Sequence, residues 1–278
     1  MKFDLRETAR DHRIIVAHRG VFGGNIPCNT IPAYETALLQ GADMIETDLD
    51  MTGDGKLVIF HPKMEKRFLN YDGSINNIPW EQVKELRYAN YDGAETQFGL
   101  VTFDELLEQF KGRCYINIDK FWGHPEEIYH AVKRHNMVDQ VLVNSPPSEP
   151  VLKVMEDLAP EMAFMPVVKE EHPWHEELVR RNINYVGVEV LFTQDDSPLA
   201  GAEFREKMHV DGQLTWVNSM VYNHKAVLSG GHSDDSALSI SREHGWGWLA
   251  DRGFDIIQTD WPQLLIDFLK ETGRYFIK

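Results

Sequence analysis

Cysteine is scarce in this chain of 278 residues, since only Cys28 and Cys114 are present and they lie far apart in the sequence. This count does not support a disulfide framework, and we expect two free thiols in a reducing compartment. Long apolar runs are also absent, because no stretch approaches the roughly 18 residues of a membrane span. The charged segment Met1–Glu7 contains no apolar run that could serve as a signal peptide, so we expect a cytoplasmic location. A leader removed before Met1 would leave the same sequence.

Positive charge is in short supply as well. The 28 lysines and arginines are outnumbered by 44 aspartates and glutamates, which gives a net charge of −16. Such a charge repels nucleic acid and anionic membrane surfaces, so neither is an expected partner. It suits a divalent cation better. An anionic substrate would have to be held locally by arginine, lysine and a metal, because the overall field does not attract it.

Linkers, internal repeats and low-complexity segments are also missing. The hydrophobic content of 42% is enough for a large core, so we expect one domain over residues 1–278, of the size of an α/β barrel. Short β-rich runs alternate with helical segments, which is typical of a parallel sheet with crossover helices. Eight such runs are predicted as strands: residues 13–17, 43–48, 115–119, 140–144, 163–167, 185–190, 214–218 and 255–259.

One further apolar run, residues 56–61, follows the second strand after only Thr52-Gly53-Asp54-Gly55. A parallel neighbour would need a crossover of a dozen or more residues, so this run is predicted to fold back through the Asp-Gly turn. The resulting β-hairpin would bring His61 roughly opposite Glu46. Residues 62–99 are polar, rich in turns and too long for an ordinary loop, and we interpret them as a small insertion that covers the site.

Two carboxylates are predicted on one face of the second strand. Glu46 and Asp48 are two residues apart, so their side chains leave the same face. At ~5 Å and an effective dielectric of about 20 they would repel by ~3 kcal/mol, so a cation is expected between them. Asp119, where the third strand ends, is predicted as a third ligand, and oxygen ligands suit Mg²⁺ or Ca²⁺. Alternatively, one acid of the pair forms a structural ion pair and Asp119 caps the next helix.

Histidines also end strands. His18 and His61 could divide the work of a displacement at phosphorus, one taking a proton from the attacking oxygen and the other protonating the leaving oxygen. A single histidine at a strand end is more often a packed, hydrogen-bonded residue. Beside His18, the planar guanidinium of Arg19 can bind two phosphate oxygens.

Three other features lie at the same expected end of the strands. Lys169 follows the predicted strand 163–167, and Glu189 lies at the end of the predicted strand 185–190. Both are candidate site residues by position alone. The long segment 222–235 would contact substrate or a second metal, or it is a solvated loop that caps a helix starting near Asp235. Asp260 with Pro262 is predicted to open the last helix, residues 263–271.

The order and spacing of these motifs resemble the glycerophosphodiester phosphodiesterase family. The resemblance rests on His18-Arg19-Gly20, Pro27-Cys28-Asn29-Thr30, the run from Gly41 to Asp48, Thr52-Gly53-Asp54-Gly55 with His61, and the run from Gly253 to Pro262. It covers nearly the whole chain and is strongest from His18 to His61.

This resemblance implies a (β/α)8 TIM barrel that hydrolyses glycerophosphodiesters to glycerol 3-phosphate and an alcohol, with one divalent cation, Mg²⁺ or Ca²⁺. The partner it implies is therefore a small-molecule phosphodiester. By matching motifs, the metal ligands are Glu46, Asp48 and Asp119, the acid–base pair is His18 and His61, and Arg19 contacts phosphate. Barrel enzymes carry such residues at the carboxyl ends of their strands, where the strand prediction also puts them.

Several positions depart from the family pattern. Cys28 replaces a usual glutamate, and Pro62 replaces an aspartate whose carboxylate and backbone N–H could orient the preceding histidine. Lys120 directly follows Asp119 where the family has Glu-x-Lys, and Trp216 stands one place later than the tryptophan of the family's Trp-Thr-Val-Asn. Lys120 and Trp216 remain candidate substrate contacts. Together these changes predict a divergent branch with an altered substrate preference.

Three alternatives remain open at this point. A phospholipase-D-like enzyme uses a similar set of histidines and acids but needs an apolar mouth, which the net charge disfavours. An isomerase or aldolase barrel would need a Schiff-base lysine and no metal. A phosphodiester-binding barrel without turnover would account for Cys28 and Pro62. The sequence fixes neither the alcohol nor the oligomeric state.

Overall fold

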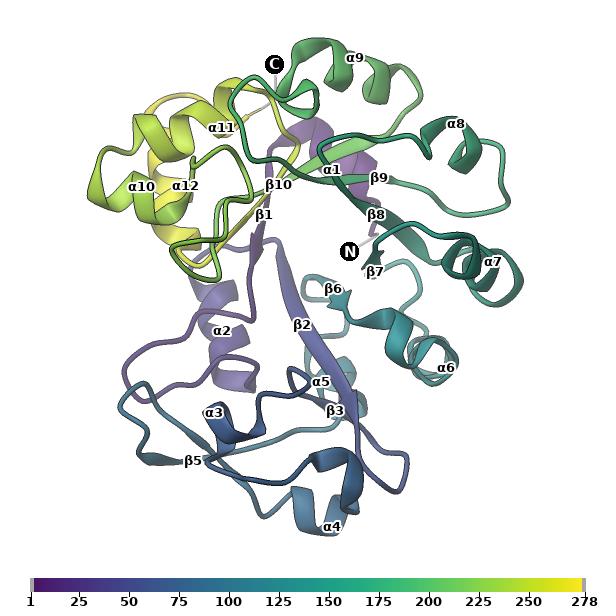
Figure 1. Cartoon of the computed structure of the whole chain (residues 1–278), viewed down its shortest axis with the longest axis vertical. Coiled ribbons are helices and arrows are strands. Elements are labelled where there is room, and N and C mark those ends of the chain that lie inside the picture. The colour runs from purple at the N-terminus through teal and green to yellow at the C-terminus, as the bar shows by residue number, and fades with distance from the viewer. Residues whose placement is uncertain (1–2, 277–278) are drawn as a thin grey trace.

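Eight parallel strands close into a barrel in the computed structural model, which describes residues 3–276 (Figure 1). The sheet runs in the order β1-β11-β10-β9-β8-β7-β6-β2, and pairing of β1 with β2 closes it. The strands are β1 (Ile14–Ala17), β2 (Met44–Met51), β6 (Tyr115–Asp119), β7 (Val141–Ser145), β8 (Ala163–Lys169), β9 (Gly187–Leu191), β10 (Leu214–Asn218) and β11 (Ile256–Thr259). Each predicted run overlaps one of them, so the predicted (β/α)8 barrel is confirmed.

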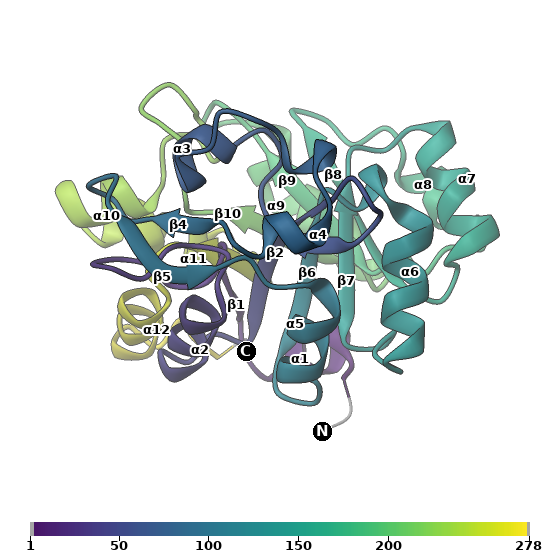
Figure 2. The same cartoon turned by 90° about the horizontal axis from the view of Figure 1, so that it is seen from below.

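Helices surround the strands, as Figure 2 shows. They are α1 (Leu5–Asp11), α2 (Ile31–Leu39), α5 (Phe103–Phe110), α6 (Pro125–Arg134), α7 (Glu149–Leu158), α8 (His175–Leu178), α9 (Ala202–Val210), α10 (Asp234–Ser239), α11 (Trp248–Asp251) and α12 (Pro262–Glu271). None of the helices within residues 3–276 has the length and apolar character that crossing a membrane requires. The outward residues of the strands pack against these helices.

Below the carboxyl ends of the strands, the barrel interior is apolar. Alternate residues of the strands point inward there and form one fully buried cluster that includes Val16, Met44, Leu142, Met165 and Trp216. Burial of this kind leaves no room for a ligand at that level. Chemistry is therefore confined to the carboxyl ends of the strands, where the inward residues become polar.

The hairpin after β2 forms as expected. Strand β3 (Leu57–Ile59) pairs antiparallel with β2, with Leu49 opposite Ile59, and the Phe60 amide donates to the Asp48 carbonyl at 3.1 Å. Continued by two residues, this register puts His61 opposite Thr47, one residue from the predicted partner Glu46, and its ring approaches Asp48.

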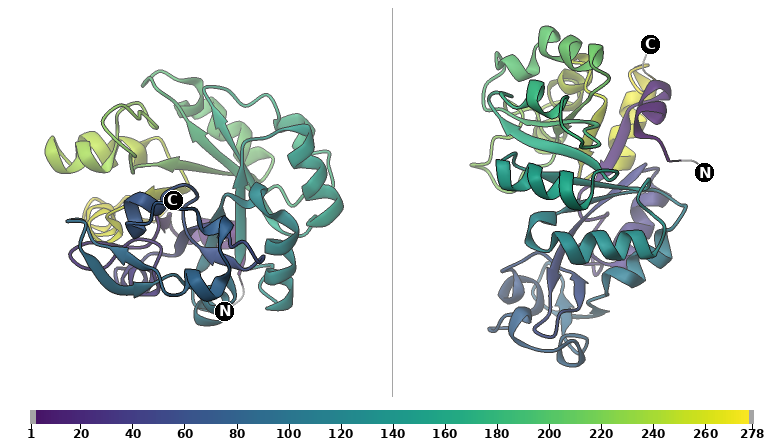
Figure 3. Two further views of the ribbon diagram at one scale, coloured as in Figure 1. Left: turned by 60° about the horizontal axis from the view of Figure 1, so that its bottom comes forward. Right: turned by 90° about the vertical axis from the view of Figure 1, so that its right-hand side faces the viewer.

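Residues 62–99 fold on one side of the barrel mouth, at one end of the longest axis of the molecule (Figure 3). They form α3 (Glu65–Leu69), α4 (Trp80–Val83), and the antiparallel pair β4 (Arg87–Ala89) and β5 (Glu95–Gly99). Leu69, Ile75, Val83 and Tyr88 build a small core there with Phe60 of the hairpin. The insertion is therefore anchored to the segment that carries His61.

Candidate active site

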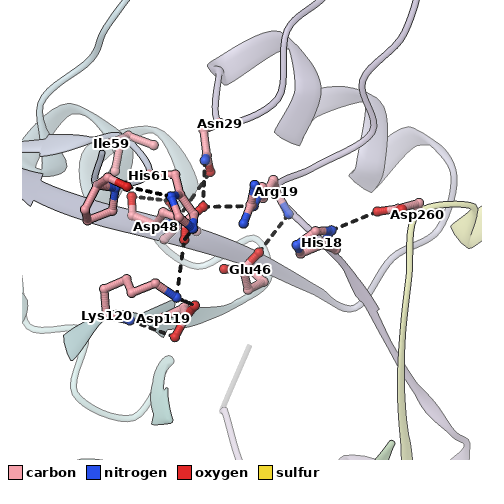
Figure 4. A network of polar contacts seen from close by, with 12 residues as sticks. His18, Arg19, Asn29, Glu46, Asp48, Ile59, His61, Asp119, Lys120 and Asp260 are labelled. Carbon is pink, nitrogen blue, oxygen red and sulfur yellow. Dashed lines mark hydrogen bonds and ion pairs between the residues drawn. The ribbon is translucent and has the colours of Figure 1, made fainter. Parts of the chain in front are cut away.

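Three acids meet at the carboxyl ends of β2 and β6. Parallel pairing puts Glu46 beside Asn117 and Asp48 beside Asp119, so the carboxylates project from adjacent strands into one place. One oxygen from each of Glu46, Asp48 and Asp119 lies within 4.8 Å of the others, and the first two residues are buried (Figure 4). The sequence prediction of a three-carboxylate cluster agrees with this geometry.

The pKa values of the two acids of β2 are shifted in opposite directions. Burial and the neighbouring charge of Asp48 raise the pKa of Glu46 to about 8. Burial also acts to raise the pKa of Asp48, but Arg19, His61 and Lys120 outweigh it, so this pKa is lowered. Oδ1 of Asp48 is buried without a hydrogen-bond partner among the described residues. A buried, unpartnered carboxylate oxygen within a set of oxygen donors fits a hard divalent cation such as Mg²⁺ or Ca²⁺.

Arg19 is held between the two acids of β2. Its backbone N–H donates to Oε2 of Glu46 at 2.9 Å, and Nε of its guanidinium lies 2.9 Å from Oδ2 of Asp48. The residue has a φ of 56°, a left-handed conformation that few side chains adopt. The turn after β1 therefore directs this side chain to the cluster.

His18 lies at the Glu46 end of the cluster (Figure 4). Its Nδ1 is 2.9 Å from Oδ1 of Asp260, the residue after β11, which pairs with β1. Burial lowers the pKa of His18, but the hydrogen bond with Asp260 and the charge of Glu46 outweigh it, so the pKa is raised overall. Asp260, which sequence reasoning assigned to the start of a helix, instead orients this ring, and α12 begins after Trp261 without a side-chain cap.

His61 lies at the other end, with Nε2 4.0 Å from Oδ1 of Asp48. Its Nδ1 is 2.9 Å from the carbonyl oxygen of Pro62. The proline therefore removes the family's usual aspartate, yet its own carbonyl accepts from the ring. This hydrogen bond leaves Nε2 as the nitrogen that faces the acids.

Both histidines, Arg19 and the three acids are gathered at one cavity of about 550 Å³, and all but Asp48 line its wall directly. Lys120 also lines it, because β6 ends at Asp119 and the lysine, with a φ of 65°, turns back. Its Nζ forms an ion pair with Asp119 and lies 3.9 Å from Oδ1 of Asp48. The lysine is thus close to where a phosphate would lie.

Trp216 is not among the cavity residues. It is fully buried in the barrel interior, and its Nε1–H donates to Oδ1 of Asn218 at 3.1 Å. The structure gives this tryptophan a packing and hydrogen-bonding role beneath the mouth, in place of the substrate contact that its motif suggested. Lys169 is exposed and lies outside the cavity, whereas Glu189 lines it.

The long segment after β10 reaches the cavity at one end and caps a helix at the other. Tyr222 lines the cavity, with its ring centroid 6.4 Å from that of His18. At the far end, Ser233 caps α10, one residue earlier than expected. Asp234 is buried and accepts hydrogen bonds from Ser219, Trp246, Thr259 and the backbone of Asp260. This anchor joins the segment to the residue that orients His18.

Two residues near the acids carried little sequence signal. Asn29 donates to Oδ2 of Asp48 at 2.9 Å and accepts from the hydroxyl of Tyr34. Cys28, at the edge of the cavity, has a pKa raised to about 12, first by burial, so its thiol is neutral and does not replace the family's carboxylate. Both belong to the motif Pro27-Cys28-Asn29-Thr30, and only this motif pointed to them in the sequence.

A family model described as the glycerophosphoryl diester phosphodiesterase family matches residues 18–198 of the chain. A second model, described as a domain of unknown function, matches residues 164–269. A glycerophosphodiester phosphodiesterase of Bacillus altitudinis is 35% identical over 142 residues, which cover 47% of this chain and 57% of that protein. One of Bacillus subtilis is 32% identical over 164 residues, covering 52% and 56%. The matched part thus spans little more than half of these relatives.

Solved structures share the fold over nearly the whole length. A glycerophosphoryl diester phosphodiesterase from Parabacteroides distasonis superimposes with a TM-score of 0.80 at 17% identity, covering 100% of this chain and 98% of that one. A phosphodiesterase of Oleispira antarctica, solved in complex with the product sn-glycerol-3-phosphate, gives 0.66 at 22% identity, covering 93% and 97%. At these identities the likeness shows the fold.

Proposed function

Because this chain belongs to the glycerophosphoryl diester phosphodiesterase family, we propose that it hydrolyses glycerophosphodiesters to glycerol 3-phosphate and an alcohol with one divalent cation. The observation that supports this most is the convergence of separate strand ends on one cavity. Three acids cluster there, an arginine lies between two of them, and a histidine stands at each end. Each of these groups has a distinct task in a displacement at phosphorus.

Glu46, Asp48 and Asp119 would hold the cation. When bound, it would polarise the phosphoryl group and stabilise the charge that develops on its oxygens. The carboxylate donors suit both Mg²⁺ and Ca²⁺. Arg19 and Lys120 reach the same cluster from two sides and would bind the remaining phosphate oxygens.

The two histidines differ in the group that accepts from Nδ1. The carboxylate of Asp260 favours the protonated ring of His18, so His18 would give a proton to the leaving alcohol. The carbonyl of Pro62 fixes the neutral tautomer of His61 that keeps a lone pair on Nε2. His61 would therefore take the proton of the attacking oxygen.

A phospholipase-D-like activity is the second candidate. The net charge of the chain disfavours it, but the side chains at the rim of the cavity favour it. Phe22, Trp122 and Tyr222 line the cavity and are 47%, 44% and 60% exposed. Such exposed aromatic side chains at a mouth could contact an acyl chain. Lysophosphatidylcholine is the substrate that distinguishes this candidate from the first.

The test is hydrolysis of glycerophosphocholine, bis-(p-nitrophenyl) phosphate and lysophosphatidylcholine, with EDTA or with added Mg²⁺ or Ca²⁺. We expect cation-dependent turnover of the first two, with glycerol 3-phosphate released from glycerophosphocholine. Faster turnover of lysophosphatidylcholine than of glycerophosphocholine would favour the phospholipase-D-like candidate. No turnover with any metal would leave a phosphodiester-binding barrel as the better description.

A further inference from the structure

The floor of the cavity is polar although the barrel below it is apolar. We use the term polar floor for Asn117, Asn144, Glu189 and Asn218, which are joined by hydrogen bonds across β6, β7, β9 and β10. The first three line the cavity, and Asn218 is joined to them by its hydrogen bond to Glu189. The three asparagines are buried. Barrel interiors at this depth are usually filled by branched apolar side chains, so four polar residues in a connected row need a physical reason.

Hydrogen bonds fix the orientation of every member of the polar floor. The indole of Trp216 can only donate, so Oδ1 of Asn218 must face it and Nδ2 of Asn218 faces Oε1 of Glu189, at 2.7 Å. From the other side, Asn117 donates to Oδ1 of Asn144 at 2.6 Å, and Nδ2 of Asn144 donates to Oε2 of Glu189 at 2.5 Å. Each carboxylate oxygen of Glu189 therefore accepts one amide N–H.

The Glu189 carboxylate can accept more hydrogen bonds than the protein donates to it. Both of its hydrogen-bond partners within residues 3–276 are neutral amides, and each oxygen keeps a second lone pair. The side chain is only partly buried, because it borders the cavity. It is not part of the three-carboxylate cluster that fits a metal. A carboxylate held by two amides, with further accepting capacity, thus lines the cavity in which the proposed substrate would bind.

We propose that Glu189 recognises the glycerol half of the substrate by accepting hydrogen bonds from its two adjacent hydroxyl groups. This inference rests on the proposed function and adds the requirement for a free 1,2-diol. The two oxygens of one carboxylate can accept from two neighbouring hydroxyls, as an acidic residue does when it binds a ribose hydroxyl in dinucleotide-binding folds. A substrate without the hydroxyls would leave the desolvated carboxylate without these donors, which is why such a site discriminates strongly.

Trp216 has a defined part in this arrangement. It is a positioning residue, since its N–H decides which end of the Asn218 amide meets Glu189. The tryptophan that stands one place away from the family pattern thus supports the diol site from below. Replacing it with phenylalanine keeps an aromatic ring in the barrel interior but removes the N–H and part of the ring volume.

Equilibrium binding provides the decisive measurement. Glycerol 3-phosphate and n-propyl phosphate have the same length and phosphate group, and only the former has the two hydroxyls. Titration calorimetry with Mg²⁺ present should show that the wild-type protein prefers glycerol 3-phosphate. In Glu189→Gln we expect this preference to fall by roughly 10–100-fold, because charge-assisted hydrogen bonds are lost. Trp216→Phe should reduce the preference in the same direction.

A matched control separates recognition from stability. Asp255 is a buried carboxylate before β11 that accepts from Thr215 and His209, away from the cavity. Asp255→Asn makes the same chemical change as Glu189→Gln and should keep the preference of the wild type, even if the melting temperature falls. A preference retained in Glu189→Gln, lost equally in Asp255→Asn, or absent from the wild type would overturn the diol site.

The outcome also distinguishes this inference from the proposed function. If the wild type hydrolyses glycerophosphocholine and bis-(p-nitrophenyl) phosphate, and Glu189→Gln loses the same factor on both, the enzyme stands and the diol site falls. If Glu189→Gln loses more on glycerophosphocholine, both are supported. If the wild type binds neither phosphate ester and hydrolyses neither diester, the proposed function fails and the diol site with it.

Discussion

The two histidines of the cavity meet different acceptors, and the difference originates in single residues. Asp260 offers a carboxylate to His18, whereas Pro62 offers only its backbone carbonyl to His61. A carboxylate stabilises an imidazolium far more than a neutral carbonyl does. The proposed division of acid and base between the two rings rests on this difference in their acceptors.

Replacing His18 with alanine should reduce kcat/KM for glycerophosphocholine at least a hundredfold, since one acid–base group contributes typically 10²–10⁴. The melting temperature should change little, because this side chain borders the cavity and not the apolar core. Steady-state kinetics and a thermal melt provide both readings. His209→Ala, which removes another aspartate-bonded histidine far from the mouth, is the control. Wild-type turnover in His18→Ala would refute the assignment.

Asp260→Asn should shift the pH dependence of activity. As the proposed acid, His18 is active when protonated, so activity is present below its pKa and is lost as pH rises through it. The pKa of His18 is raised, with the hydrogen bond to Asp260 and the charge of Glu46 outweighing burial. The asparagine can still accept a hydrogen bond from Nδ1 but carries no negative charge to stabilise the imidazolium, so the alkaline limb of the kcat profile should move to lower pH. An unmoved limb would show that another group titrates there.

Strand ends were enough to predict most of the residues around the cavity, but not their orientation. Glu46, Asp48 and Asp119 follow from alternation on two strands, because parallel strands end at the same edge. Asp260 was assigned to a helix start, since an aspartate before Trp-Pro fits a cap equally well. Only the pairing of β1 with β11 decides that its side chain meets His18.

At the scale of elements, the turn from β1 to α2 depends on one close approach. Gly20 has a φ of 77°, and a Cβ added there would lie 2.6 Å from the carbonyl carbon of Ala33 at the start of α2. Gly20 therefore permits close contact between the turn and the helix. The contact fixes the direction in which Arg19 leaves the backbone.

Gly20→Ala should lower the free energy of unfolding by about 2 kcal/mol or more, because it adds a left-handed alanine to a steric overlap. It should also reduce activity by displacing Arg19. Urea unfolding followed by circular dichroism measures the stability. Gly123→Ala is the matched control, since that glycine has no positive φ and no heavy atom within 4 Å of an added Cβ. Equal stability of the two variants would contradict this account of the turn.

The hairpin and the insertion differ in how far sequence could predict them. The five-residue link 52–56 before β3 leaves only an antiparallel return, so the hairpin follows from chain length. The internal fold of residues 62–99 does not follow, because its small core joins residues such as Leu69 and Tyr88 without a regular period. The prediction that the insertion covers the site gave its place near the mouth, but not the packing on Phe60 that anchors it there.

For the whole molecule, the barrel was predictable because eight apolar runs are separated by helical segments of suitable length. The polar floor was not, because it depends on the burial of Trp216 and on the direction of amide groups across four strands. The net charge of −16 agreed with a cation site but gave no position for it. Charge summed over a chain describes the field around the molecule, whereas a metal site needs oxygens from specific strand ends.

The effect of a metal on the stability of the whole protein should depend on pH. In the metal-free protein Glu46 has a pKa of about 8, raised by burial and by Asp48, so this acid is protonated at pH 6. A cation that binds there must displace the proton, which reduces its apparent affinity roughly tenfold for each pH unit below 8. The sign follows directly: binding strengthens as pH rises to about 8 and then levels off.

Thermal melts with excess Mg²⁺ or with EDTA, at pH 6 and at pH 8.5, measure this dependence. Because a ligand that binds only the folded state raises its stability, the increase in melting temperature caused by Mg²⁺ should be larger at pH 8.5. The metal-free protein should itself be less stable at the higher pH, since a carboxyl with a raised folded-state pKa holds a proton that the unfolded chain releases. Glu46→Gln removes this titration and one ligand together, so it should lose both effects. An equal Mg²⁺-induced increase at the two pH values would place the cation away from Glu46.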